Sequence, residues 1–262
     1  MKDIIFSTEI LTEFELDSMQ ETKVRAIIIT PKESEDLLKK DIMGRMSKDY
    51  VLDSVQDYEK TEILSSEPLL TAIKPYLKDE DYTICLYADT PFVSSQIVVD
   101  ALEYAVAKKV DFCKLPRGAI VKASAVKANK IELTCEASFL NAQDFYYIFN
   151  LSTLANAREK MRHNILERLS KNVEFDALNS CYIDSTVQIK PNTHIGANCV
   201  IRGYTTIGEN CKIADNNIIT NCKIGDNCEV SCSNLKNVDI KQGTKIPPFT
   251  FKEKKQWNWL LD

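Results

Sequence analysis

The chain has 262 residues, a formal net charge of −5 at pH 7 and 44% hydrophobic residues. This length suits one large domain or two modest ones, and the mild acidity leaves no basic surface of the kind that binds nucleic acid. No apolar stretch of about 18 residues occurs, so the sequence predicts no membrane span. Glu9 and Glu13 interrupt any signal-peptide core, and we therefore expect a cytoplasmic protein that binds neither nucleic acid nor membranes.

Short apolar runs alternate with amphipathic segments in the first half of the chain. Strands are predicted at residues 24–30, 82–88, 110–115 and 119–123, and helices at residues 66–77 and 95–108. This alternation is typical of a mostly parallel sheet that is covered by helices on both faces. Functional residues of such sheets lie at the carboxyl ends of the strands. Asp89, which directly follows strand 82–88, is therefore the first candidate.

A long amphipathic helix is predicted next, at residues 153–170, with Ser152 as its N-cap. Its apolar side chains recur at helical spacing and form one stripe: Leu154, Ala157, Met161, Ile165 and Leu169. The opposite face is mainly charged. The helix is interpreted as a linker that packs by its apolar stripe.

A hexapeptide repeat occupies residues 181–246. An aliphatic residue recurs every six positions from Ile183 to Ile219, and after one five-residue step the period resumes at Ile224. A small or β-branched residue stands two places before many of them. Ordinary alternating strands have a period of two and do not keep a period of six. The repeat predicts a parallel β-helix in which three hexads close one triangular coil and the aliphatic side chains stack inside.

The nine cysteines do not indicate a metal site or a disulfide framework. Their number is odd and no CxxC pair occurs. Several of them fall on the small inward position of the hexads, where cysteine packs as a small hydrophobe. Cys228 and Cys232 have metal-ligand spacing, but no second pair or nearby histidine completes a site.

Three segments together resemble a known family. Residues 86–93 read LYADTPFV, residues 149–159 read FNLSTLANARE, and residues 213–230 contain hexads with a five-residue step. In this order they resemble the bacterial bifunctional N-acetylglucosamine-1-phosphate uridylyltransferase and glucosamine-1-phosphate acetyltransferase family. The resemblance covers residues 24–252, and it suggests a shortened, divergent member.

The resemblance implies a fold with an α/β part and an all-β part. Residues 1–151 are expected to form a degenerate nucleotidyltransferase-like, Rossmann-like domain with a mostly parallel sheet. Residues 152–170 are the linker helix. Residues 171–262 are expected to form a left-handed parallel β-helix, in which Trp257 and Trp259 belong to a C-terminal segment that caps the last coil or docks on a neighbouring subunit.

The resemblance also implies a metal site. Asp89 falls on the position of the family's metal-binding aspartate, and Asn150 on that of its second metal ligand, an asparagine. Mg²⁺ sites usually combine one or two protein oxygens with substrate phosphates, so the two residues would hold Mg²⁺ against a nucleotide or sugar phosphate. The structural alternative is that Asp89 caps the turn before Thr90 and Pro91.

The segment after strand 24–30 departs from the family, which binds its nucleotide there with a Gly-rich loop. Residues 31–36 read PKESED, without a glycine that would let the backbone approach phosphates and with carboxylates that would repel them. Lys39 and Arg45 are only weak counterparts of the family's catalytic arginine, so no catalytic residue is assigned. The sugar-binding insert is reduced to residues 115–118. We therefore expect weak or absent uridylyl transfer.

The acetyltransferase features are also incomplete. The family's acetyl-CoA site and catalytic histidine lie in coils beyond the last residue of this sequence, so acetyl-CoA is not expected as a cofactor. His194 falls on an outward position of an early hexad and His163 on the linker helix. Both are interpreted as surface imidazoles, because a general base must first lie within reach of its proton.

Three functions of different classes remain open. The first is a sugar-1-phosphate nucleotidyltransferase of the UDP-N-acetylglucosamine pyrophosphorylase type. The second is a non-catalytic protein that binds a sugar nucleotide or regulates a partner, and the third is a hexapeptide acyltransferase. As in the family, the flat outer faces of the coils are expected to pack around a threefold axis. Val200, Tyr204 and Ile218 on these faces support a homotrimer.

Overall fold

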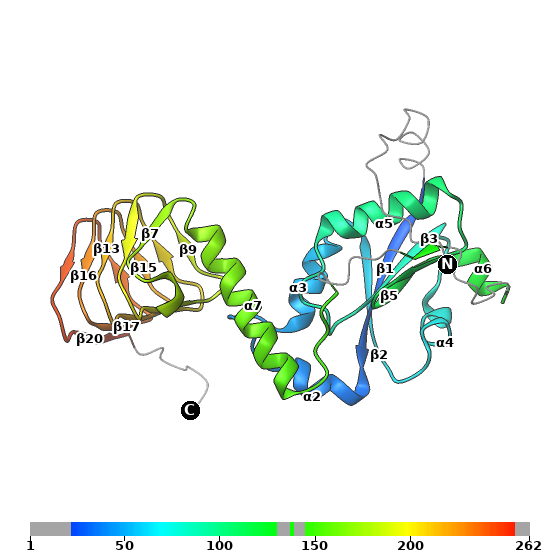
Figure 1. Ribbon diagram of the computed structural model, residues 1–262, viewed down its shortest axis with the longest axis horizontal. Helices are drawn as coiled ribbons and strands as arrows, with labels where there is room; N and C mark the ends of the chain where they lie inside the picture. The colour runs from blue at the N-terminus through cyan, green and yellow to red at the C-terminus, as the bar shows by residue number, and fades with distance from the viewer. Residues whose placement is uncertain (1–21, 130–136, 139–144, 255–262) are drawn as a thin grey trace, which may run out of the picture. The chain divides into compact units, whose positions relative to one another are not determined.

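The computed structural model describes residues 22–129, 137–138 and 145–254 (Figure 1). The chain divides into two compact units. The first contains the chain up to Lys40 and Met46–Thr153, and the second contains Asp41–Arg45 and the chain from Leu154 onward. Trp257 and Trp259 lie outside the described residues, so their role as a cap stays a prediction.

A six-stranded sheet forms the centre of the first unit, in the order β2-β1-β3-β5-β4-β6. Its strands are β1 (Val24–Pro31), β2 (Glu59–Ser65), β3 (Tyr82–Tyr87), β4 (Phe112–Leu115), β5 (Gly118–Lys122) and β6 (Ala137–Ser138). Pairings of β1 with β2, β1 with β3 and β4 with β6 are parallel. The majority is parallel, as predicted, and the two antiparallel pairings arise because β4 and β5 form a tight hairpin on β3.

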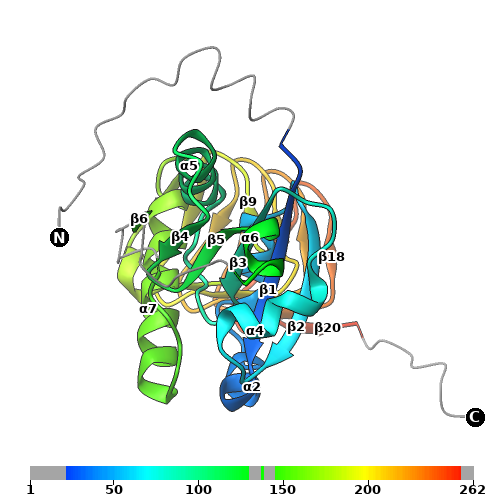
Figure 2. The ribbon, with the colours of Figure 1, turned by 90° about the vertical axis from the view of Figure 1, so that its right-hand side faces the viewer.

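Helices cover both faces of this sheet. They are α2 (Glu35–Leu38), α3 (Ser47–Ser54), α4 (Leu69–Ile73), α5 (Ser95–Ala107) and α6 (Ala123–Lys127), with 3-10 turns η1 (Lys32–Ser34) and η2 (Lys74–Tyr76). On one face Ile27 and Cys85 pack with Ile73 of α4 and Val126 of α6. In Figure 2, α4 and α6 lie on the viewer's side of the sheet. The other face is covered by α3 and α5, since both helices contact strands of the sheet and each other.

Two sequence expectations for the first unit need correction. The helix predicted at residues 66–77 is α-helical only at Leu69–Ile73 and continues as the 3-10 turn η2. Pro75 is the physical reason, because proline supplies no N–H and its ring clashes with the preceding turn. The strand β2 is not among the predicted strands. It is an edge strand in which only Ile63 is buried, so it shows little apolar pattern.

The long helix α7 extends over Leu151–Leu169, and its N-terminal turn contains the boundary between the two units. Leu154, Ala157, Met161 and Ile165 of the predicted stripe are buried, and Leu169 is half-buried. The helix begins before the predicted Ser152 cap, because the Asn150 side chain accepts a hydrogen bond from the Thr153 N–H at 2.8 Å.

The second unit is a parallel β-helix, as the hexapeptide repeat predicts (Figure 1). Its strands form three parallel sheets in the orders β19-β16-β13-β10-β7, β20-β17-β14-β11-β8 and β18-β15-β12-β9. The strands are β7 (Val173–Phe175), β8 (Tyr182–Ile183), β9 (Gln188–Ile189), β10 (Thr193–Ile195), β11 (Val200–Arg202), β12 (Thr206–Ile207), β13 (Lys212–Ile213), β14 (Ile218–Thr220), β15 (Lys223–Ile224), β16 (Glu229–Val230), β17 (Asn234–Lys236), β18 (Asp239–Ile240), β19 (Lys245–Ile246) and β20 (Phe251–Glu253), with the 3-10 turn η3 (Leu178–Ser180) before β8.

The register of the coils explains the period of the sequence. Ile183 pairs with Ile201, and Ile201 with Ile219, so residues eighteen apart stack one coil above the other. The inward position is aliphatic from Ile183 to Ile246, and Ile195, Ile201 and Ile213 are fully buried. The corners are filled by small side chains such as Cys199, which is also fully buried. Each coil therefore repeats the same packing, and the repeat is the direct cause of the fold.

Asparagine in a left-handed backbone conformation makes many of the turns between these strands. Positive φ angles near +55° occur at Asn192, Asn198, Asn210, Asn216, Asn221, Asn227 and Asn237. Asparagine is among the few non-glycine residues that adopt this conformation at low cost. Among the described residues, no helix is both long and apolar enough to span a membrane.

Candidate functional site

Asp89 lies at the carboxyl ends of the parallel strands β1 and β3. The N–H of Ala88 donates to the carbonyl of Ile29 at 2.8 Å, so the pairing of the two strands continues up to the residue before Asp89. The Asp89 carbonyl accepts a hydrogen bond from the N–H of Ile148 at 2.9 Å. Its side chain is only 1% exposed. Asp89 is thus held rigidly at the edge of the sheet where such folds place their sites.

The carboxylate of Asp89 is bound by the guanidinium of Arg117. Nη2 of Arg117 lies 2.6 Å from Oδ2 of Asp89, and Nε lies 3.3 Å from Oδ1. Two parallel N–H···O bonds of this kind are the strong, directional form of an arginine–carboxylate pair. The Arg117 side chain remains 31% exposed. One side of the guanidinium is therefore anchored while the group still reaches solvent.

The tight turn between β4 and β5 places Arg117 beside Asp89. Gly118 has a φ of +126° and pairs with Leu86 of β3. A side chain at this position would collide with the backbone of Cys85. Only glycine lets β5 begin so close to the end of β3, and Arg117 is the residue directly before it.

Aromatic rings lie around the Arg117 guanidinium. Its central carbon is 4.2 Å from the ring centroid of Tyr87 and 5.1 Å from that of Tyr147. The ring of Tyr147 also contacts Phe149, with centroids 5.2 Å apart. Tyr147 and Phe149 are 44% and 55% exposed. An arginine with aromatic neighbours and exposed ring faces is a combination that can recognise a phosphate together with a planar group.

Burial and charge act in opposite directions on the Asp89 carboxyl. Burial raises the pKa of Asp89 above its ordinary value, the hydrogen bond and positive charge of Arg117 lower it, and the negative charge of Glu33 adds to the rise. Burial lowers the pKa of Arg117, but the contact with Asp89 outweighs this and raises it overall. The guanidinium is always charged, and it favours the ionised form of the carboxyl against the effect of burial.

Asn150, the second predicted metal ligand, acts as a helix cap. Its Oδ1 accepts the N–H of Thr153 at 2.8 Å, and the Thr153 hydroxyl lies 3.2 Å from the same oxygen. Asn150 follows two residues after Ile148, whose N–H binds the Asp89 carbonyl. The fold therefore brings the chain around Asn150 next to Asp89, but the amide oxygen already has donors.

The residues do not fit a divalent cation as the structure places them. Both oxygens of Asp89 accept hydrogen bonds from Arg117, and the Asn150 oxygen accepts from the first turn of α7. A Mg²⁺ ion needs free oxygen ligands at close range. No group of three or more His, Cys, Asp or Glu side chains that could hold a metal occurs within residues 22–129, 137–138 and 145–254. The metal at Asp89 and Asn150 stays a prediction.

The segment after β1 is rich in carboxylates, which repel phosphates. It forms the 3-10 turn η1 and the short helix α2. The charge of Glu33 reaches both Asp89 and Tyr87, since it raises the pKa of each. Lys39, a weak candidate for the catalytic cation, is paired with Glu35 at 2.9 Å and Asp36 at 3.3 Å. The described segment therefore carries three carboxylates and no glycine at the end of β1.

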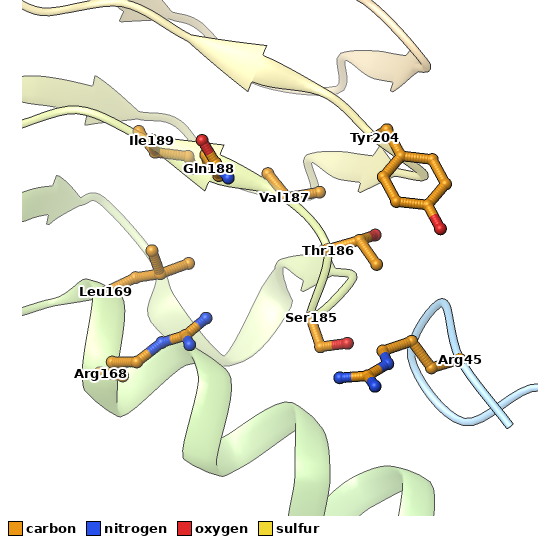
Figure 3. A pocket seen from close by; sticks show the side chains of 9 residues that line it. All are labelled: Arg45, Arg168, Leu169, Ser185, Thr186, Val187, Gln188, Ile189 and Tyr204. Atoms are coloured by element: carbon orange, nitrogen blue, oxygen red, sulfur yellow. The ribbon is translucent and has the colours of Figure 1, made fainter. Parts of the chain in front are cut away.

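The second unit contains a separate pocket of about 650 Å³ (Figure 3). Arg45, the other weak candidate, lines this pocket together with Arg168 at the end of α7. In Figure 3 the two guanidinium groups point into the space from opposite sides. Its remaining lining is provided by Leu169, Ser185, Thr186, Val187, Gln188, Ile189 and Tyr204. Two arginines with hydroxyl and amide groups would suit an anionic ligand.

His194 is held by a hydrogen-bond partner on the neighbouring coil. Its Nε2 lies 2.9 Å from Oδ1 of Asp176, and its Nδ1 is buried without a hydrogen-bond partner. One ring nitrogen is therefore held by Asp176 and the other is buried, and the interpretation of His194 as a surface imidazole stays a prediction.

Sequence reasoning missed Arg117 as the partner of Asp89, and Tyr87 and Tyr147 as its neighbours. One signal in the sequence could have found the arginine. Gly118 is one of only two glycines in the first 180 residues, directly after an arginine and between two predicted strands. This composition predicts a tight hairpin that brings the arginine against the neighbouring strand.

Curated relatives resemble part of this chain. It is 38% identical over 96 residues to the bifunctional protein GlmU of Lactobacillus johnsonii, a match that covers 36% of this chain and 21% of the relative. It is 36% identical over 97 residues to GlmU of Caldanaerobacter subterraneus, a match that covers 37% of this chain and 21% of that relative. With GlmU of Alkaliphilus metalliredigens the identity is 28% over 112 residues, and the match covers 42% of this chain and 25% of that relative. The matches span about a quarter or less of the relatives' length, and over this part they confirm the resemblance that the sequence motifs indicate.

Two further comparisons complete this result. No family model matches the chain. Among solved structures, 4-diphosphocytidyl-2C-methyl-D-erythritolsynthase from Anaerococcus prevotii aligns with a TM-score of 0.45 and 9% identity, over 58% of this chain and 100% of that chain.

Proposed function

We propose that this is a nucleotidyltransferase-like protein of the sugar-1-phosphate type, which binds a sugar nucleotide at the Asp89 edge of its α/β unit and has weak or absent uridylyl transfer. The observation that carries the proposal is the pair of Asp89 and Arg117 beside exposed aromatic rings, at the carboxyl ends of two parallel strands. The partial identity to bifunctional GlmU proteins supports this class of activity. UDP-N-acetylglucosamine is the sugar nucleotide that the family resemblance favours.

Two parts of such a ligand, the phosphate and the nucleobase, have suitable partners at the site. The exposed N–H groups of Arg117 can donate to a phosphate, because only two of its five donors are used by Asp89. The rings of Tyr147 and Phe149 offer faces for stacking a nucleobase. Stacking of a base on an aromatic side chain contributes about 1–3 kcal/mol in single-stranded nucleic-acid complexes.

Two features argue for weak binding and slow transfer. The charge of Glu33 lies close enough to raise the Asp89 pKa, so it also opposes a phosphate. Phosphoryl transfer depends on positioning and charge stabilisation, and residues 31–36 contain no glycine and include Pro31, which has no N–H. We expect at best millimolar nucleotide affinity, about −4 kcal/mol.

A binding screen and a transfer assay test the proposal. Thermal shifts are measured with UTP, UDP-N-acetylglucosamine, glucosamine-1-phosphate and acetyl-CoA, each with and without Mg²⁺. Uridylyl transfer is followed by the pyrophosphate released when a phosphate oxygen of N-acetylglucosamine-1-phosphate attacks the α-phosphorus of UTP. We expect stabilisation by UDP-N-acetylglucosamine that is lost in Asp89→Ala, and pyrophosphate release near background in both proteins.

A matched pair of tyrosines separates stacking from general effects of substitution. Tyr147 and Tyr76 are both 44% exposed, but only Tyr147 lies beside Arg117. Tyr147→Ala should abolish the shift by UDP-N-acetylglucosamine, whereas Tyr76→Ala should preserve it. No shift in wild type, or equal shifts in both variants, would contradict binding at this edge. Robust pyrophosphate release that requires Asp89 would instead show a working transferase.

The pocket in the second unit supports a second candidate, the binding of an anionic small molecule by the β-helix. Arg45 and Arg168 on opposite sides of the space are the favourable observation. A phosphorylated acyl carrier such as acetyl-CoA is one ligand of this kind, although the pairing of His194 with Asp176 speaks against acyl transfer by that histidine. A shift by acetyl-CoA that disappears in Arg168→Ala and persists in Arg202→Ala would support this candidate.

A further inference from the structure

We propose that Arg117 is the resident cation of the Asp89 edge and takes the position that a divalent metal would occupy, so that this site works without a metal. The proposal concerns the same site as the proposed function. It does not depend on nucleotide binding, because the metal can be titrated alone.

The first step of the argument is the geometry of the carboxylate. Asp89 is 1% exposed, and both of its oxygens accept N–H groups of one guanidinium. The backbone of Asp89 is fixed on both sides, because the Ala88 N–H binds Ile29 and the Asp89 carbonyl accepts from Ile148. A metal that binds this carboxylate would therefore compete with Arg117 for a side chain that is almost completely buried.

The second step is that Arg117 itself is held in place. The turn before Gly118 is compact, because Gly118 lies against the Cys85 carbonyl. The guanidinium packs against the rings of Tyr87 and Tyr147. Cation–π contacts and the bidentate hydrogen bonds act on the same group, so displacement by a hydrated ion must break both.

The third step concerns what the arrangement offers to a ligand. A guanidinium is positive at every accessible pH and presents donors that match phosphate geometry. A metal site presents a positive group to a phosphate only after the ion has bound, whereas Arg117 is part of the chain. Replacement of the ion by Arg117 therefore keeps a positive group at the edge of the sheet and makes phosphate binding independent of chelators.

The test is a titration with Mn²⁺, followed by electron paramagnetic resonance of the free ion, on the full chain without nucleotide. Wild type and Asp89→Asn should bind the same background amount of Mn²⁺. Arg117→Gln, which removes the charge but keeps a side chain of similar reach, should gain a site with affinity about tenfold or more above that background, because a like charge has been removed. The double variant Arg117→Gln with Asp89→Asn should lose this gain.

Two results would overturn the proposal. The first is a Mn²⁺ site in wild type that Asp89→Asn removes, because the carboxylate would then bind metal in the presence of Arg117. The second is an equal background in Arg117→Gln and the double variant, because Asp89 would then offer no cation position. If Arg117→Gln does not fold, the comparison of wild type with Asp89→Asn still decides, since the proposal requires that the two be equal.

Where UDP-N-acetylglucosamine binds, its thermal shift should be unchanged by a chelator, and a shift that requires Mg²⁺ would also contradict the proposal.

Discussion

A Cβ atom on Gly118 would lie 2.2 Å from the backbone carbonyl oxygen of Cys85. The two strands that carry these residues approach so closely that the β4–β5 hairpin has one permitted residue at this point. Because Arg117 precedes Gly118, the same contact determines where the guanidinium meets Asp89. A packing restriction in the sheet thus decides the chemistry at its edge.

Gly118→Ala should destabilise the α/β unit by about 3 kcal/mol, because it combines a backbone clash with a φ of +126° that a side chain disfavours. Gly243→Ala is the control. Its φ is +70°, but no atom lies within 4 Å of the added carbon, so only about 1 kcal/mol is expected. Urea denaturation measures both. Equal losses would show that the approach of Gly118 to Cys85 is not as close as described.

The stability of Arg117→Gln should depend on pH. Removal of one partner of a buried ion pair costs about 3–5 kcal/mol when the other charge is left behind. The folded-state pKa of Asp89 is already raised by burial, and loss of Arg117 raises it further. The folded protein therefore binds this proton more tightly than the unfolded chain.

The sign of the effect follows from this difference in proton binding. Below the ordinary carboxyl value, about 3.9, Asp89 is protonated in both states and the variant should be close to wild type. As the pH rises through the folded-state pKa, the variant should lose stability relative to wild type. The double variant with Asp89→Asn should show no such trend. Free energies of unfolding at several pH values test this, and a deficit that is largest in acid would contradict it.

Met161→Asp should destabilise the β-helix unit by about 3–5 kcal/mol, because the new carboxylate would be buried without a partner. Met161 is 8% exposed in the apolar stripe of α7. Asn164→Asp introduces the same side chain on the exposed side of the helix and should change stability by less than about 0.5 kcal/mol. Thermal or urea unfolding followed by circular dichroism measures both, and similar values would show that the stripe is not buried.

The cysteines of the β-helix should resist alkylation. Burial raises the pKa of Cys199 to about 11, and it also raises the pKa values of the Cys211 and Cys222 thiols. Cys232 is half-buried and should be modified first. Mass spectrometry after brief treatment of the native protein with iodoacetamide locates the label, in a Cys135→Ser background because that residue lies outside the described part of the chain. Rapid labelling of Cys199 would contradict the packed interior.

We propose, as the family resemblance suggests, that the β-helix units associate as a homotrimer. Val200 and Ile218 are paired neighbours on the outer face of one sheet, and Ile218 is 44% exposed. Ile218→Lys should lower the molar mass in light scattering toward that of a monomer, whereas Asp239→Lys on another sheet should not. A monomeric wild type at micromolar concentration would refute the proposal.

The sequence alone determined the β-helix, because its information is local and repeated. Each coil needs an apolar side chain at the same inward position. The inward residues from Ile183 to Ile246 can therefore be identified from the period alone, without knowledge of any distant contact. The strands β1 and β3 were also predictable, since buried strands are continuous apolar runs. The edge strand β2 was not, because a strand exposed on most positions has no such signature.

Only the tertiary structure decided what Asp89 does. The motif after β3 indicates a metal ligand, yet the carboxylate meets Arg117, a residue 28 positions away. That meeting depends on a hairpin that folds back on β3 and on a glycine that permits close approach. Asn150 likewise becomes the cap of α7 through the position of one backbone N–H. The periodicity of a sequence predicts which side chains are buried. The partner of a buried charge depends on how close two strands lie in the folded chain, because a buried charge needs a partner within hydrogen-bond distance.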